Sequence, residues 1–392
     1  MILSWLKILI ALALIIPRGY LLVYVIDRSK NFSLGFKFFV GWVFGLAAFT
    51  LDIFASTAMT GFPLAWWIYA YAVLGQIIGL EFVIFLFERK LLLPDFRKIK
   101  PFLIRQKQNF SSWSGWEKLI LAGILVTLLI WFSLSLWQAR NFGSLNDNNL
   151  TYQQVLTNHK ITKNLCYQVY PLNDSLIKVW LQSFTGDRFF PYLAFTSLFY
   201  YLIFILIFYN FLHNTFSRAS KLLVIYFLSN LPLIYFDPSL AQADLLATVF
   251  LFITLGCFVY SLMGFGNSYF YISGIAWAFL SWTKNSGLVL ILPLLIIVTS
   301  ILWLLKKRNY KAMFIYWFFA ILTISPWLSY IIVNKINVFD YYFRYWNWSY
   351  LINGFWELLP LIILLGMFIY QQFFGKIRSE SLVSKPEPLV KL

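Results

Sequence analysis

The chain is poor in charged residues, and acidic residues are the scarcer kind. Asp, Glu, Lys and Arg make up 12% of its 392 residues, with 15 acidic against 31 basic side chains. Apolar residues reach 61%, and the mean hydropathy is +0.74. A soluble domain has too little interior to bury that much apolar surface, so the sequence predicts an integral membrane protein.

Several kinds of reactive site are also missing. The two cysteines, Cys166 and Cys257, fall in a polar segment and an apolar one, so a disulfide between them is not expected. The two histidines, His159 and His213, lie in separate loops and form no metal-ligand cluster. We find no Walker A loop, dinucleotide-binding fingerprint, nucleophile elbow or HExxH motif. We therefore expect no cofactor, although a divalent metal is left open.

The net charge of +16 has two readings. A basic chain suits nucleic acid, but no nucleic-acid-binding module surrounds these residues. Basic loops also hold the cytoplasmic side of a membrane protein against anionic lipids. We therefore expect membrane lipids as partners and no nucleic acid.

Apolar segments of about twenty residues, the length that crosses a bilayer, recur along the chain. They predict an all-α polytopic membrane protein with about eleven transmembrane helices. The predicted spans are roughly 2–26, 38–58, 64–87, 118–138, 189–212, 220–236, 241–263, 269–283, 287–305, 312–333 and 354–374. Pro17-Arg18 breaks the first of them, which reads as a short span plus an interfacial segment.

The basic residues predict an orientation in the plasma membrane. With the N-terminus outside, 21 of the Lys and Arg residues fall in inside segments and 8 in outside segments, as the positive-inside rule requires. The C-terminus is then cytoplasmic. Four segments share the outer side: residues 139–188, 235–241, the turn at Lys284, and 334–353.

A basic cytoplasmic linker, 88–117, divides the predicted chain into two parts. Before it lies an N-terminal three-span module, 1–87, and after it an eight-span unit, 118–374. The tail, 375–392, has the composition of a disordered cytoplasmic segment.

Acidic residues near the predicted outer surface are candidates for chemistry. Asp147 follows the fourth span by about nine residues, and it reads either as a general base or as a solvated Asp in a turn. Asp237 precedes a proline in a surface turn. Asp244 opens the seventh span, where a carboxylate serves either a binding pocket or the helix N-terminus.

Lys284 is the cation of an otherwise uncharged outer turn. It can hold a lipid phosphate, helped by Asn285 and by N–H groups of the following helix, or it can simply end a helix by snorkelling. In the large loop, Tyr170-Pro171 leads into an amphipathic helix, 175–184, that lies on the membrane or packs on the bundle. The aromatic loop 340–350 suits sugar stacking or an interfacial belt.

The order of these features resembles the bacterial GT-C superfamily of polyprenyl-phosphate-sugar-dependent glycosyltransferases. These are relatives of protein mannosyltransferases and of the aminoarabinose transferase that modifies lipid A. The resemblance runs from about Glu117 to Asp340. It rests on a long outer loop with Asp147 near its start, the segment YPLNDSLIKVWLQSFTGD, Ala243-Asp244 at a span start, and the turn Lys284-Asn285-Ser286-Gly287.

The resemblance implies a GT-C-like bundle with a large first outer loop. It also implies inverting transfer of a sugar from a polyprenyl-phosphate donor to a lipid or glycan acceptor on the outer face. Asp147 would be the general base, Lys284 would hold the donor phosphate, and Asp174 is a second candidate base. Many relatives carry two neighbouring acids where this chain has Asn146-Asp147. The predicted donor-binding residues are Lys284, Asn285, Asp244, Asp237, Tyr170 and Asp174.

Three other functions remain open. An O-antigen ligase or polymerase has a similar large loop, with basic residues and a histidine; His159 and Arg140 are present, without a clear pattern. A lipid-linked-sugar transport protein is the second, although the sequence shows no repeat symmetry and no midplane polar groups. A catalytically inactive scaffold is the third.

Overall fold

The computed structural model describes residues 2–27, 32–88, 110–142, 147–159, 161, 171–186, 191–212, 217–230, 244–304 and 310–338. Within these ranges the regular structure is entirely helical, which confirms the all-α class. The predicted last span, 354–374, and the tail lie outside the described residues.

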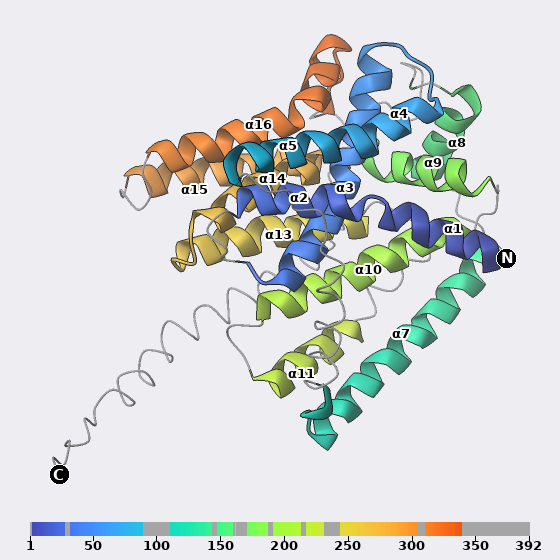
Figure 1. Ribbon diagram of the computed structural model, residues 1–392, viewed down its shortest axis with the longest axis vertical. Helices are drawn as coiled ribbons and strands as arrows, with labels where there is room; N and C mark the ends of the chain where they lie inside the picture. Colours follow the sequence, from blue (N-terminus) through green and yellow to red (C-terminus); the bar gives the residue numbers. More distant parts are fainter. Residues whose placement is uncertain are drawn as a thin grey trace.

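The helices of the described ranges follow one another without strands between them (Figure 1). They are α1 (Ile2–Ala13), α2 (Ile16–Ile26), α3 (Leu34–Phe54), α4 (Trp66–Ala70), α5 (Gln76–Glu88), α7 (Gly115–Phe142), α8 (Asp147–Asn158), α9 (Asn173–Thr185), α10 (Pro191–Phe211), α11 (Arg218–Ser229), α13 (Asp244–Leu262), α14 (Asn267–Thr283), α15 (Leu292–Leu304) and α16 (Tyr310–Val333). Three π-helical turns adjoin them: η1 (Ala55–Met59) extends α3, η2 (Tyr71–Gly75) joins α4 to α5, and η5 (Gly287–Ile291) leads into α15.

Six helical segments of the described chain are long and apolar enough to cross a membrane, which supports the membrane class. They are Leu6–Ile26, Leu34–Met59, Trp66–Glu88, Gly115–Leu134, Asp244–Leu262 and Tyr310–Val333. Two shorter apolar helices, Thr196–Phe211 and Gly287–Ser300, fall on further predicted spans. The total of eleven spans stays a prediction.

The first predicted span consists of two helices. The helix α1 ends at Ala13 and α2 begins at Ile16, so the break comes just before Pro17. Pro17 lies in the first turn of α2, where backbone N–H groups have no acceptor within the helix. Proline has no N–H, so its presence there removes no helical hydrogen bond. The proline that breaks the first span therefore also starts the second helix.

Small residues allow α2 and α3 to cross closely. A Cβ atom added to Gly19 would lie 1.6 Å from the carbonyl oxygen of Gly41, and one added to Gly45 would lie 2.8 Å from that of Ile15. Gly41 and Gly45 are four residues apart and so lie on one face of α3, the spacing that lets helices approach in membranes. Larger side chains at this crossing would push α2 away from α3.

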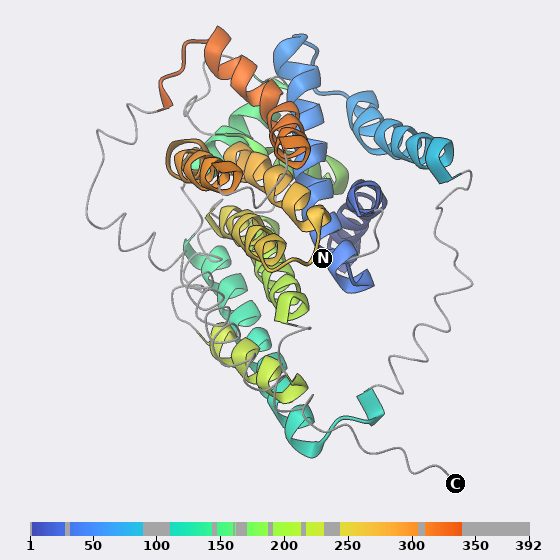
Figure 2. The same ribbon diagram turned by 90° about the vertical axis from the view of Figure 1, so that its left-hand side faces the viewer.

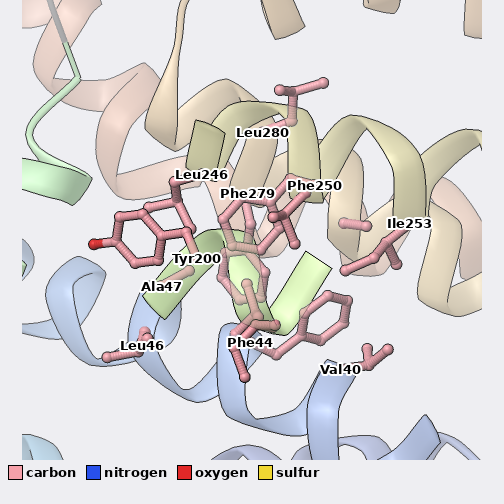
Figure 3. Packing of buried hydrophobic residues seen from close by; sticks show 14 of the residues in the cluster. Val40, Phe44, Leu46, Ala47, Tyr200, Leu246, Phe250, Ile253, Phe279 and Leu280 are labelled. Carbon is pink, nitrogen blue, oxygen red and sulfur yellow. The ribbon is translucent and has the colours of Figure 1, made fainter. Parts of the chain in front are cut away.

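A single hydrophobic core joins α3 to the helices that follow the predicted linker. The ring of Phe44 in α3 lies 5.1 Å from that of Phe279 in α14 and 6.3 Å from that of Phe250 in α13 (Figure 3). Tyr200 of α10 adjoins this cluster with its hydroxyl pointing away from it. Residues of the predicted N-terminal module and of the predicted catalytic unit thus share one interior.

The helices α8 and α9 lie together at the end of the bundle that also holds the N-terminus (Figure 1). Figure 2 views several helices of the bundle nearly end-on and shows α7 and α11 packed together to one side. The helix α13 starts, and α14 ends, at the end where α9 packs against α14. This arrangement brings α8 and α9 to the end of the bundle that holds the start of α13 and the Lys284 turn.

Candidate functional site

Two of the predicted donor-binding residues form an ion pair. The Lys284 ammonium, directly after α14, contacts the Asp244 carboxylate at the start of α13. Their side chains are 26% and 28% exposed, so the pair is open to solvent or ligand on one side. Residues forty positions apart therefore form one partly accessible charge pair.

The turn that carries Lys284 is held tightly against α14. The Lys284 backbone is extended, with φ −149° and ψ 134°, and this conformation ends the helix. A Cβ atom on Gly287 would lie 2.6 Å from Ser281 Oγ, so glycine is required for this close approach. The indole N–H of Trp277 donates to the Gly287 carbonyl at 2.8 Å. The position of Lys284 is thus fixed from both sides of the turn.

The N–H groups that follow Lys284 are used within the turn itself. Gly287 N–H donates to the Lys284 carbonyl at 3.0 Å, and the N–H groups of Leu288 and Val289 both donate to the Asn285 carbonyl at 2.9 Å. These three amides are therefore not directed at a ligand. Asn285 is 1% exposed, whereas the Lys284 side chain is 26% exposed, so the ammonium is the accessible positive charge of this turn.

A buried hydrogen-bonded network lies next to the ion pair. The Asn173 side chain accepts from Thr50 Oγ1 at 2.6 Å and donates to Thr283 Oγ1 at 2.7 Å. The Trp282 indole N–H donates to Thr50 Oγ1 at 3.0 Å. Because buried polar groups are costly when unpaired, this network fixes the start of α9 against α3 and the last turn of α14.

A second Asp–Lys pair is fully enclosed in the protein. Lys178 Nζ lies 2.6 Å from Asp174 Oδ2, and the two side chains are 0% and 2% exposed. The Tyr200 hydroxyl donates to Asp174 Oδ1 at 3.2 Å. The amphipathic segment therefore packs on the bundle as α9, and its first carboxylate is covered by protein.

The other predicted site residues are less fully described. Asp147 is the first residue of α8, and α8 packs against α9, so its backbone belongs to the same end of the bundle. Tyr170, Asp237 and the aromatic loop 340–350 lie outside the described residues.

Sequence reasoning missed the residues that position the site. Thr50 and Trp282 look like ordinary members of apolar spans, and no pattern in the sequence pairs them. The Asp174–Lys178 spacing of four residues is a readable signal, because such residues face each other on a helix. The positioning residues that were missed are Thr50, Asn173, Lys178, Tyr200 and Trp282.

Comparisons with protein-family models, with curated proteins and with solved structures find no match to this chain. The function is therefore argued from the chemistry of the site itself.

Proposed function

We propose that this chain is a membrane glycosyltransferase. It transfers a sugar from a polyprenyl-phosphate donor to a lipid or glycan acceptor at the outer face of the plasma membrane. The observation that carries the proposal is the partly exposed Asp244–Lys284 pair at one end of apolar helices. A lipid-linked phosphate arrives at that depth, since its isoprenoid tail stays in the bilayer.

Lys284 is the proposed phosphate ligand. Its ammonium can exchange the Asp244 carboxylate for a phosphate oxygen, to which its N–H groups then donate. Asp244 then accepts hydrogen bonds from sugar hydroxyls beside the phosphate. Because the turn is clamped by Trp277 and Gly287, the cation is already placed before the donor binds.

The proposed reaction is a single displacement. The acceptor hydroxyl oxygen attacks the anomeric carbon from the side opposite the phosphate. The carbon–oxygen bond to phosphate breaks, and the polyprenyl phosphate leaves with the electron pair. The acceptor proton moves to the Asp147 carboxylate, and configuration at the anomeric carbon inverts. Lys284 stabilises the charge that develops on the leaving phosphate.

Asp174 is proposed to position α9 and not to act as the base. Its carboxylate is buried, paired with Lys178 and hydrogen-bonded by Tyr200. A group that must take a proton from an acceptor needs access to that acceptor, which the enclosed Asp174 carboxylate lacks.

The orientation is part of the proposal. The excess of basic residues in the inside segments supports a topology in which the 139–188 loop lies outside and the C-terminus is cytoplasmic.

The test is sugar transfer by the purified chain in liposomes. The donor is a labelled sugar on polyprenyl monophosphate, and the acceptor is a membrane glycolipid extract. Asp147→Asn should lower the rate by roughly 10²- to 10⁴-fold, the usual contribution of a general base. The neighbouring Asn148→Ala serves as the matched control and should keep its activity.

Three results would each count against part of the proposal. Wild-type protein that transfers no sugar from the monophosphate donor would overturn the function, and transfer only from a diphosphate-linked glycan would favour a ligase or polymerase. Unchanged turnover in Asp147→Asn would remove Asp147 as the base while leaving the transferase assignment in place.

A further inference from the structure

A cleft of about 1090 Å³ lies along the C-terminal half of α9, and the residues of the two ion pairs are not part of its described lining. At a rise of 1.5 Å per residue, Asp174 and Ser183 are about 14 Å apart along the helix axis, whereas Lys178 directly precedes the lining residue Val179. Leu14, just after α1, forms part of its wall, together with residues of α8, of α9 and of the segment from Leu64 through η2. The cleft is therefore distinct from the proposed donor site, although one helix borders both.

The polar side chains that line the cleft include amides, hydroxyls and an imidazole. Gln153, Thr157 and His159 come from α8 and the residue after it, and Gln182 and Ser183 come from α9. The described lining includes no Asp, Glu, Lys or Arg. Amides and hydroxyls both donate and accept, as sugar hydroxyls do, whereas the described lining offers a charged headgroup no carboxylate, ammonium or guanidinium as a partner.

Aromatic side chains form another part of the lining. Trp180 packs with its ring centroid 5.1 Å from that of Phe49 and 5.2 Å from those of Tyr69 and Phe184. Trp66 stands at the edge of the cleft and is largely exposed. Fixed aromatic faces beside uncharged hydrogen-bonding groups match a sugar ring, which has apolar C–H faces and polar edges.

The walls of the cleft are tied together by hydrogen bonds. The Leu64 N–H donates to the His159 carbonyl at 2.7 Å, which joins the chain before α4 to the end of α8. The Tyr69 hydroxyl lies 3.4 Å from Ser183 Oγ, which joins α4 to α9. The cleft is thus built before any ligand enters.

An apolar track leaves the cleft along η2 and α5. Leu74 lines the cleft, and Ile78, Phe82 and Phe85 follow at spacings of four, four and three residues, so all four lie on one face. They are 57%, 68%, 59% and 46% exposed. Figure 2 shows α5 at the periphery of the bundle. In a helix that crosses a membrane, this face contacts hydrocarbon.

We infer that the cleft binds a glycolipid, with an uncharged sugar headgroup between α8 and α9 and a hydrocarbon chain along α5. The lining selects the headgroup by its hydroxyls and its neutrality, and the track accounts for the chain. In the proposed transferase this lipid is the acceptor. That role rests on the proposed function, whereas the binding itself does not.

The test measures binding without any sugar donor. The chain is placed in phosphatidylcholine nanodiscs, and diglucosyl diacylglycerol is titrated and counted by native mass spectrometry. Phosphatidylglycerol supplies a charged headgroup and diacylglycerol no sugar, both with the same chains. We expect the glycolipid to bind at least about tenfold more tightly than either, the equivalent of one or two net hydrogen bonds.

Two adjacent exposed residues provide a matched pair of variants. Thr157 lines the cleft and Asn158 does not. Thr157→Trp should narrow the cleft and weaken glycolipid binding by about tenfold or more, whereas Asn158→Trp should bind as the wild type does. Gln182→Leu, which removes an amide from the lining, should weaken binding without filling the space.

Equal binding of the three lipids, or binding by Thr157→Trp equal to that of Asn158→Trp, would overturn the glycolipid site. Such a result would leave sugar transfer untouched. A chain that binds the glycolipid selectively but never transfers sugar would keep the cleft and overturn the transferase.

Discussion

Two Asp–Lys pairs lie near the N-terminal end of α9 and differ in how much protein covers them. Asp174–Lys178 is enclosed, with side chains 2% and 0% exposed, and a tyrosine hydroxyl completes its bonding. Asp244–Lys284 is open, with about a quarter of each side chain exposed. The charges are the same, and the surroundings decide what each pair can do.

The enclosed pair cannot exchange partners without leaving a charge buried, so it belongs to the structure. The open pair can exchange partners, because water or a ligand replaces a lost partner at modest cost. An ion pair that binds a phosphate has to be open in this way. The following predictions test this difference, beginning with the largest expected effect on free energy.

Lys178→Met should destabilise the fold by about 3–5 kcal/mol, because it leaves the Asp174 carboxylate buried without its counter-charge. The free energy of unfolding in mixed detergent micelles is the measurement.

The control for Lys178→Met is the double variant with Asp174→Asn, which removes both charges and should recover most of the lost stability. If Lys178→Met alone were as stable as the wild type, the pair would not be enclosed.

Lys284→Met should weaken binding of the polyprenyl-phosphate donor by roughly 10- to 150-fold, the loss of one charge-assisted hydrogen bond worth about 1.5–3 kcal/mol. Stability should change by less than about 1 kcal/mol, as for other exposed pairs. Donor titration gives the change in affinity, and unfolding of the same preparation gives the change in stability.

The matched control is Lys335→Met, which replaces an exposed lysine just after α16 and should bind the donor normally. Equal losses in both variants would mean that the donor responds to overall charge.

Thr50→Val should destabilise the fold by about 1–3 kcal/mol, because it leaves the Asn173 amide oxygen and the Trp282 indole N–H without their buried partner. The free energy of unfolding is the measurement.

Thr254→Val is the control for Thr50→Val. Thr254 is equally buried, but its hydroxyl bonds the Phe250 carbonyl of its own helix, so the loss should be small. Similar losses in the two variants would contradict the network as the anchor of α9.

Asp244→Asn should have the smallest effect on stability, at most about 1 kcal/mol. It should tighten binding of sugar-free polyprenyl monophosphate by up to about fivefold, because the carboxylate no longer competes for Lys284. Titration of that lipid into nanodiscs that hold the variant shows whether its affinity rises or falls. Weaker binding would contradict competition between Asp244 and phosphate.

The features that the sequence predicted are those that depend on local residue pattern and on the distribution of charge. The all-α class, the break beside Pro17 and the common side of Asp244 and Lys284 all follow from span length, proline chemistry and the positive-inside rule. Two surfaces were left open for the amphipathic segment, the membrane and the bundle, because a broad apolar face suits both. The structure places it on the bundle as α9.

Contacts between spans that are distant in the sequence could not be predicted. Thr50 and Phe44 belong to an apolar helix whose residues would suit lipid or protein on any face, so nothing in the pattern shows which face packs inward. The Thr50–Asn173–Thr283 network depends on three segments that meet only after folding. The cleft beside η2 was missed for the same reason.

A structure of the chain in a lipid nanodisc with bound polyprenyl-phosphate sugar tests the central claim most directly. The measured quantity is the distance from Lys284 Nζ to the nearest phosphate oxygen. We predict a hydrogen bond, at about 2.7–2.9 Å, with the Asp174–Lys178 pair unchanged. A phosphate bound elsewhere, with the Asp244–Lys284 pair still closed, would contradict the account.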